Sequence, residues 1–127
     1  MRRVVLDMQN YLFADAIAKT LRDYDFDFLT EMSQSPEKTE ELCRLVQANI
    51  LIMEVRECEL WRLEDRMKTC QSVRKAVPNC KIVMCVDEKR YKEVAASVVK
   101  YKKIGLIDNF IFTTISASYL SALLDAL

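Results

Sequence analysis

Ile50-Leu51-Ile52-Met53 is the most apolar run of the chain, and Glu54 follows it directly. A run without alternation is typical of a strand that is covered on both faces, at the centre of a parallel sheet. Similar runs occur at residues 4–6, within the segment 2–8, and at residues 82–86 and 110–112. Residues 25–30 (Asp-Phe-Asp-Phe-Leu-Thr) alternate instead, which predicts a half-exposed edge strand.

Between these strands, apolar residues recur every three or four positions, which is the pattern of one helix face. The second helix is expected to begin at Ser35-Pro36, with Ser35 as its N-cap. The fourth is expected to stop near Gly105, the only glycine, in a left-handed cap. The apolar positions expected on the helices are Leu12, Phe13, Ala16, Ile17, Leu21 and Tyr24 in the first; Leu42, Leu45 and Val46, turned inward, in the second; Leu60, Leu63, Met67, Cys70 and Val73 or Val77 in the third; Val94, Ala95, Val98 and Tyr101 in the fourth; and Ile115, Tyr119, Leu120 and Leu123 in the fifth.

The order of the predicted elements is a strand followed by a helix, five times. Such alternation is typical of an α/β fold with a doubly wound parallel sheet and helices on both faces. The edge-like second strand fits a flavodoxin-like (βα)5 sheet with strand order 2-1-3-4-5. No linker, repeat or low-complexity stretch interrupts residues 1–127, so we expect a single domain.

Composition excludes several kinds of site. The chain has no His, which excludes His-ligated metals and His-based triads, and its single Gly excludes glycine-rich nucleotide loops. Lys and Arg number 19, as do Asp and Glu, which argues against electrostatic capture of nucleic acid or membrane. Five cysteines form no C-x-x-C pair and are expected as reduced thiols. No apolar run is long enough to span a membrane and no secretory signal is present, so we expect a cytoplasmic protein without metal or cofactor.

Ligands of a doubly wound sheet bind beyond the carboxyl ends of the strands, near the point where the strand order reverses. In the order 2-1-3-4-5 that point lies between the first and third strands. The residues expected at this edge are Asp7, Met8 and Gln9 after the first strand, Glu54, Val55 and Arg56 after the third, Val86 and Asp87 after the fourth, and Thr113 and Thr114 after the fifth.

Four segments resemble the receiver domain of bacterial two-component response regulators. They are R-V-V-L-D-M-Q-N-Y-L-F-A-D-A-I (3–17), A-N-I-L-I-M-E-V (48–55), N-C-K-I-V-M-C-V (79–86) and D-N-F-I-F-T-T-I-S-A-S-Y-L-S-A-L-L (108–124). The last is similar to the closing strand and helix of receivers that carry a helix-turn-helix output domain. The resemblance covers nearly the whole chain, from residue 2 to residue 124.

The positions that carry receiver chemistry differ in this chain. Receivers bind Mg²⁺ with two acids after the first strand, phosphorylate an Asp that ends the third, and use a Ser/Thr and a Lys after the fourth and fifth. An ungapped alignment places Met8 and Gln9 at the acid pair, and a slip of one residue brings in Asp7. The remaining positions fall on Glu54, Val86 and Thr113. A thioether is a poor Mg²⁺ ligand, so the resemblance is to a degenerate pseudo-receiver.

Two residues at this edge have alternative interpretations. Glu54 is either a fixed mimic of a phosphorylated Asp or a polar residue that ends a strand and accepts a backbone hydrogen bond. Trp61, in the segment R-E-C-E-L-W-R-L (56–63), either plugs the pocket and packs there or helps to present a partner surface.

Charge is divided along the chain. Residues 23–65 carry 12 acids and 4 bases, a net charge of −8, whereas residues 66–103 carry 11 bases and 3 acids, a net charge of +8. This division is either that of ordinary solvated helices or that of a module that docks a partner or its own copy. The resemblance places the partner and homodimer face on the fourth helix, fifth strand and fifth helix, at residues 91–101, 110–112 and 117–124. Its anchors are expected to be Tyr91, Val94, Val98, Tyr101, Phe110, Phe112 and Tyr119.

These observations favour a signalling module, not an enzyme, that acts by protein–protein contact and independently of phosphorylation. The resemblance implies a pseudo-receiver of a transcriptional regulator, which would meet DNA only through an output domain outside this chain. One alternative is an atypical receiver that is still modified or switched by a ligand at Glu54. Another is a small-molecule binder on a flavodoxin-like fold, which the scarcity of Gly, His and clustered acids disfavours.

Overall fold

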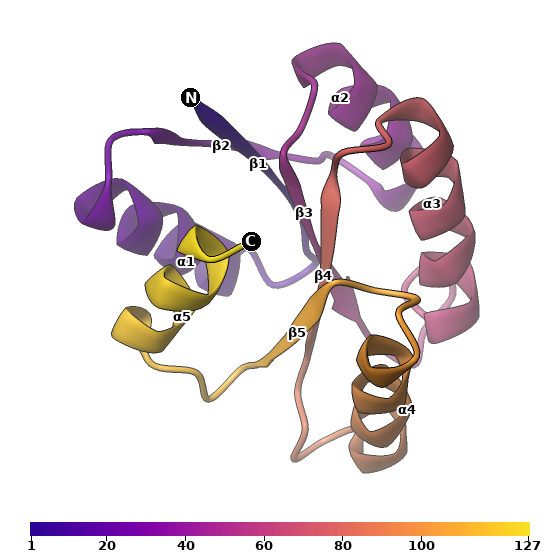
Figure 1. Cartoon of the computed structure of the whole chain (residues 1–127). Coiled ribbons are helices and arrows are strands. Elements are labelled where there is room, and N and C mark those ends of the chain that lie inside the picture. Colours follow the sequence, from indigo (N-terminus) through magenta and orange to yellow (C-terminus); the bar gives the residue numbers. More distant parts are fainter.

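The computed structural model describes residues 1–127 as one parallel sheet between two layers of helices (Figure 1). The strand order is β2-β1-β3-β4-β5, which confirms the predicted flavodoxin-like topology. The strands are β1 (Arg2–Asp7), β2 (Phe28–Met32), β3 (Ile50–Val55), β4 (Lys81–Val86) and β5 (Asn109–Phe112). The helices are α1 (Tyr11–Tyr24), α2 (Thr39–Val46), α3 (Leu63–Ala76), α4 (Lys92–Lys103) and α5 (Ala117–Asp125), with a short 3₁₀ turn at Pro36–Lys38.

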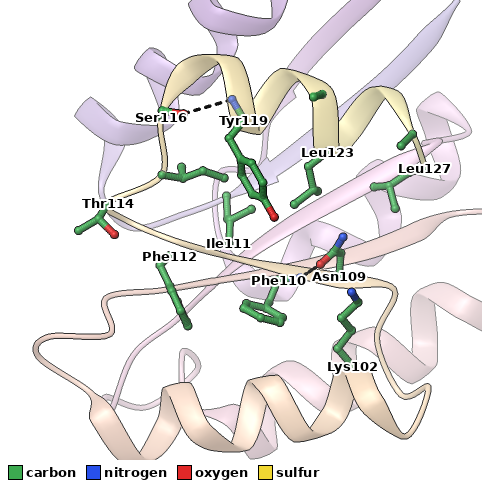
Figure 2. Close-up of a pocket in the computed structure, with 13 residues that line it drawn as sticks. Lys102, Asn109, Phe110, Ile111, Phe112, Thr114, Ser116, Tyr119, Leu123 and Leu127 are labelled. Atoms are coloured by element: carbon green, nitrogen blue, oxygen red, sulfur yellow. Dashed lines mark hydrogen bonds between the residues drawn. The ribbon is translucent and has the colours of Figure 1, made fainter.

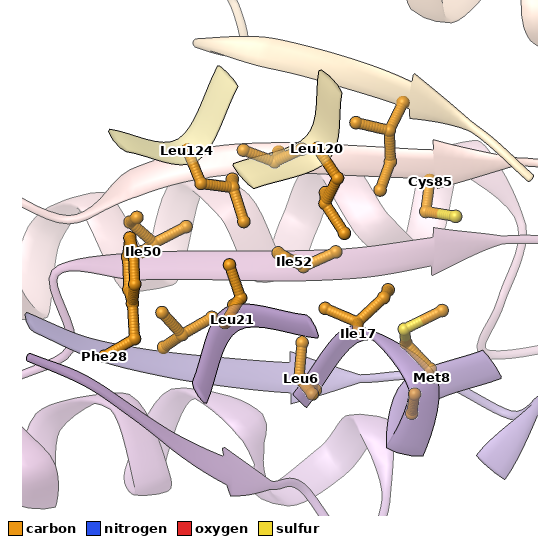
Figure 3. Packing of buried hydrophobic residues seen from close by; sticks show 14 residues of the cluster. Leu6, Met8, Ile17, Leu21, Phe28, Ile50, Ile52, Cys85, Leu120 and Leu124 are labelled. Carbon is orange, nitrogen blue, oxygen red and sulfur yellow. The ribbon is translucent and has the colours of Figure 1, made fainter. Parts of the chain in front are cut away.

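Two apolar clusters hold the layers together. Helices α1 and α5 cover one face of the sheet, where Ile17, Leu21, Leu120 and Leu124 pack on the even-numbered residues of β1 and β3 (Figure 3). Helices α2, α3 and α4 cover the other face, over the odd-numbered residues of the same strands. Because both faces are covered, all six residues of β3 are buried, as its unbroken apolar run predicts.

The ends of several elements have local causes in the sequence. Asn10 caps α1 by accepting a hydrogen bond from the Phe13 amide at 3.1 Å, and Ser116 caps α5 in the same way through the Tyr119 amide at 3.2 Å. Gly105 follows α4 with φ +83°, which confirms the predicted left-handed residue. None of the helices is long and apolar enough to cross a membrane.

Three expectations about the edge of the fold are wrong in whole or in part. The second strand is Phe28–Met32 and not residues 25–30, because the Asp25 carboxylate and carbonyl accept hydrogen bonds from Asp27 and Phe28 and close a turn there. Ser35 is the N-cap and Pro36 the first residue of a 3₁₀ turn, as predicted, but the Ser35 side chain makes no capping hydrogen bond and α2 itself begins only at Thr39. Helix α2 turns Thr39 and Cys43 inward, which leaves Leu45 79% exposed.

Five further apolar positions do not join their helix faces: Leu12, Ala16 and Tyr24 in α1, Leu60 before α3 and Tyr119 in α5 are all exposed. Leu12 is 83% exposed at the start of α1, where Ala14, Ile17 and Leu21 form the buried stripe. Leu60 lies in the loop before α3, with φ +73°, because α3 begins only at Leu63.

Candidate functional site

The predicted site residues gather at the carboxyl edge of the sheet, but they do not form one cluster. Asp7 ends β1 and pairs in register with Met53, so Glu54 lies one residue further along β3. Side chains alternate along a strand. Asp7 therefore shares a face with Val5, under α2–α4, whereas Glu54 shares a face with Ile52, under α1 and α5. The two carboxylates point to opposite sides of the sheet.

Asp7 forms a buried ion pair with Arg66 of α3. Arg66 Nη1 donates to Asp7 Oδ2 at 2.7 Å, and Nη2 donates to the Asp7 carbonyl at 2.9 Å. Arg66 Nε donates to the carbonyl of Glu54 at 2.8 Å. Both side chains are almost fully withdrawn from solvent, at 0% and 1% exposure. The guanidinium therefore joins the carboxyl ends of β1 and β3 and supplies a fixed positive charge there.

Two hydroxyl groups complete the surroundings of Asp7. Thr39 Oγ1 donates to Asp7 Oδ2 at 2.6 Å, and Ser33 Oγ lies 2.8 Å from Thr39 Oγ1. Asp7 Oδ1 has no partner in the protein. A charged carboxylate at this depth is stable only when it is paired, and Arg66 and Thr39 supply the pairing.

Both carboxylate oxygens of Glu54 also accept hydrogen bonds from groups of the same chain. Its Oε1 accepts hydrogen bonds from the amides of Gln9 at 2.7 Å and Asn10 at 3.0 Å, in the loop between β1 and α1. Its Oε2 accepts from Arg56 Nη1 at 2.9 Å. The side chain is only 8% exposed. These contacts are those of the second interpretation of Glu54, a strand-ending residue bonded to backbone amides.

Trp61 lies over the guanidinium of Arg66. The centre of its ring is 4.4 Å from the guanidinium carbon, a cation–π contact. The loop before α3 holds Trp61 there, because the Arg56 amide donates to the Trp61 carbonyl at 2.8 Å and the Trp61 amide donates to the Cys58 carbonyl at 3.0 Å. Trp61 is half-buried, and its contact with the ion pair is through the Arg66 guanidinium.

The remaining positions offer little to a phosphoryl group or a cation. Met8 is buried in the cluster under α1, near the carboxyl ends of the strands (Figure 3). Val86 is fully buried, and the Thr113 amide donates to its carbonyl at 3.3 Å. Thr114 is engaged elsewhere, since its hydroxyl donates to Glu88 at 2.8 Å. Nowhere in the chain do three or more acidic or cysteine side chains come close enough to share a metal ion.

Arg66, Thr39 and Ser33 are absent from the sequence-based expectations. A signal for Arg66 exists, because it stands at the helical spacing of the buried stripe, between Leu63 and Cys70. A basic residue at a core position needs an acidic partner. Asp7, at the end of a buried strand, needs a basic partner. A buried Arg66 and a buried Asp7 in one sequence therefore predict an ion pair between them.

The expected partner face is only partly exposed. Tyr119 is 63% exposed, Tyr91, Val94, Tyr101, Phe110 and Phe112 are half-buried, and Val98 is fully buried in the core. A groove of about 830 Å³ runs along β5, between α4 and α5 (Figure 2). Its walls are mostly apolar, and Lys102 is the only charged residue among them. Thr114 is the one expected carboxyl-edge residue in this groove, and Asp7, Met8, Gln9 and Glu54 lie outside it.

The cysteines are free thiols. Cys43, Cys70, Cys80 and Cys85 are buried, and Cys58 is exposed in the loop before α3. Burial raises the pKa of the Cys70 and Cys85 thiols above its ordinary value, so both are protonated at neutral pH.

No protein-family model and no curated protein matches the sequence. The fold matches solved structures of receiver domains. A receiver domain protein from Clostridium thermocellum has a TM-score of 0.78 at 10% identity, over 99% of this chain and 93% of that chain. A DNA-binding response regulator of the LuxR family from Staphylococcus aureus has a TM-score of 0.75 at 12% identity, over 99% and 98%. A protein from "a novel family of redox sensors in the streptococci evolved from two-component response regulators" has a TM-score of 0.76 at 11% identity, over 99% of this chain and 50% of that chain. The chain thus has the fold of receiver domains.

Proposed function

We propose that this chain is a receiver-like regulatory module that acts by protein–protein contact and is not switched by phosphorylation. The observation that carries the proposal is the buried ion pair between Asp7 and Arg66. In this arrangement the acid that follows the first strand is bound to a cation that belongs to the chain. A divalent ion would have to displace that guanidinium before it could reach the carboxylate.

The chemistry of phosphoryl transfer supports the same conclusion. Such transfer depends on positive charge at the oxygens of the moving group, from a metal ion or a Lys. Here Met8 and Thr113 stand where the resemblance expects an acid and a Lys. Glu54 is longer than Asp by one methylene, and both of its oxygens already accept hydrogen bonds from the chain. A misplacement of about 1 Å at a nucleophile slows a reaction by about 100-fold.

The contact surface in this proposal is the face formed by α4, β5 and α5. The groove along β5 is apolar, and Tyr119 at its rim is largely exposed, which is typical of an interface anchor. The occupant is a protein partner or a second copy of the chain. Since the fold neighbours include a DNA-binding response regulator, we propose a place in transcription regulation, with DNA bound by a separate output domain.

The test is titration with Mg²⁺ and beryllofluoride, a phosphoryl analogue, monitored by amide chemical shifts and by sedimentation. We expect no saturable shift at Glu54 or Thr113 and no change in oligomeric state. The matched control is Glu54→Gln, which removes the charge and keeps one carbonyl acceptor for the Gln9 and Asn10 amides. Shifts that saturate in the wild-type chain and vanish in Glu54→Gln would overturn the proposal and identify an atypical receiver with a working site.

A further inference from the structure

The two edges of the sheet carry opposite charge. Strand β2 and helix α2 form one edge, where residues 28–46 hold four acids and two bases. Strand β5 and helix α4 form the other, where residues 89–103 hold six bases and one acid. We call these the acidic edge (residues 28–46) and the basic edge (residues 89–127, from α4 through α5). The added residues 104–127 hold two acids, Asp108 and Asp125, and both are already paired with an arginine.

Most of these charged side chains form no ion pair within the molecule. At the acidic edge, Glu31, Glu37 and Glu41 make no ion pair. At the basic edge, none of the bases of α4 and its preceding loop makes one; they are Lys89, Arg90, Lys92, Lys100, Lys102 and Lys103. Unpaired charges of opposite sign on opposite edges are available for contact between molecules.

Each edge also has a groove, lined mostly by polar residues at the acidic edge and mostly by apolar residues at the basic edge. On the acidic edge, a groove of about 350 Å³ lies between β2 and α2. Its wall contains the exposed Leu45, with two acids, Glu31 and Glu41, and one base, Lys38. On the basic edge, the groove of about 830 Å³ along β5 has Tyr119 and Lys102 in its wall (Figure 2). Both grooves lie next to an edge strand whose outer side pairs with no other strand. Each edge therefore offers an exposed apolar side chain, Leu45 or Tyr119, together with charge and a free strand edge.

We propose that copies of this chain associate head to tail, with the acidic edge of one copy on the basic edge of the next. This inference rests on the proposed use of the α4–β5–α5 face for contact and names its occupant. A dimer that paired two basic edges would bring the lysines of α4 close to their own copies, whereas the head-to-tail contact pairs them with Glu31 and Glu41. A contact between two different surfaces does not close on itself unless the rotation closes a ring. The expected product is therefore an open chain or ring of subunits and not a symmetric dimer.

The test is sedimentation velocity of the full chain over a wide concentration range, at low and high salt. We expect the average mass of the wild-type chain to rise with concentration without a plateau at the dimer, and to fall at high salt. Leu45→Arg blocks the acidic edge and Tyr119→Asp blocks the basic edge. Each variant alone is expected to associate about tenfold more weakly or not at all.

A mixture of the two variants separates the proposal from its rivals. Leu45→Arg keeps an intact basic edge and Tyr119→Asp keeps an intact acidic edge, so the equimolar mixture should form a 1:1 heterodimer that does not grow. Leu12→Arg is the matched control, because Leu12 is 83% exposed and lies outside both grooves. This control should associate like the wild-type chain. All three substitutions are at exposed positions, where we expect folding to be preserved.

Two outcomes would overturn the head-to-tail contact. One is a dimer of Leu45→Arg alone, which would show that two basic edges pair. The other is a wild-type chain that stays monomeric at every concentration, which would mean that the face binds a different protein or none. Neither outcome bears on the beryllofluoride titration, so failure of this inference and failure of phosphate independence are distinguishable.

Discussion

Arg66 and Asp7 form an ion pair across 59 residues of sequence, with Nη1 2.7 Å from Oδ2 and neither side chain more than 1% exposed. Removing two charges from water is unfavourable, and only good geometry and further hydrogen bonds offset that loss. Both conditions hold here, since Arg66 also donates to two backbone carbonyls and Asp7 also accepts from Thr39. The pair is thus a structural centre at the position where the fold usually places a ligand.

Removing one partner of this pair should destabilise the fold strongly. We expect Arg66→Met to lower the free energy of unfolding by about 3–5 kcal/mol, because Asp7 is then buried without its cation. Asp7→Asn should act in the same direction, and the double variant should lose less than the sum. Urea denaturation of all four proteins measures the coupling. Strictly additive losses would contradict a direct interaction, and the exposed pair Lys19–Asp23 is the control, for which changes close to zero are expected.

Glu54 is expected to hold the loop after β1 in place. Glu54→Ala leaves the amides of Gln9 and Asn10 without their acceptor and should lower the free energy of unfolding by about 1–3 kcal/mol. Glu54→Gln should lose less, because its carbonyl oxygen can still accept. Faster amide hydrogen exchange at Gln9 and Asn10 in Glu54→Ala would measure the loss of these hydrogen bonds directly. Unchanged exchange in Glu54→Ala would mean that the carboxylate does not order this loop.

The stabilising contacts of Asp125 with Arg2 and Tyr24 should be lost in acid. Hydrogen bonds from the Arg2 guanidinium and the Tyr24 hydroxyl hold the pKa of Asp125 below its ordinary value of 3.8. A depressed carboxyl pKa stabilises the fold above that ordinary value, and the stabilisation disappears as pH falls through the lower folded value. Asp125→Asn should therefore melt below wild type at neutral pH, with a gap that closes in acid. Melting curves over a pH series test this, and a gap independent of pH would refute it.

Thiol chemistry should distinguish one cysteine from four. Cys58 is exposed, whereas the other four are buried, and burial raises the pKa of Cys70 and Cys85. A thiol reagent should modify one cysteine quickly in the folded chain and the other four only on unfolding. Mass spectrometry locates the label, and Cys58→Ser should abolish the fast reaction. Fast labelling of Cys43 or Cys80 would show that the α2–β4 region opens readily.

The order of the sheet was predictable because four of its strands are unbroken apolar runs. A central parallel strand has no exposed face, so residues 50–53 could only be placed inside. The edge was harder, since residues 25–30 alternate as a strand does, although Asp25 closes a turn instead. Leu45 was misplaced for a related reason, because α2 is short and its buried positions, Thr39 and Cys43, are not its most apolar ones.

The residues of the candidate site were predictable from the sequence, but the hydrogen bonds and ion pairs among them were not. Sequence spacing places Asp7 and Glu54 at the same edge, and the strand register then separates their side chains onto opposite faces. Arg66 was overlooked because a charged residue in a helix is ordinarily solvated. Only the three-dimensional meeting of α3 with β1 shows that this residue completes Asp7.

The pairing of Asp7 with Arg66 also constrains how the chain folds during synthesis. Asp7 leaves the ribosome with β1, while its neighbour strand β3 begins at Ile50 and its cation follows only with α3. A nascent chain that ends before residue 66 has the acid of β1 without its counter-charge. We therefore expect the first strand to reach its final packing only after α3 has been synthesised, because its buried carboxylate lacks a counter-charge until then.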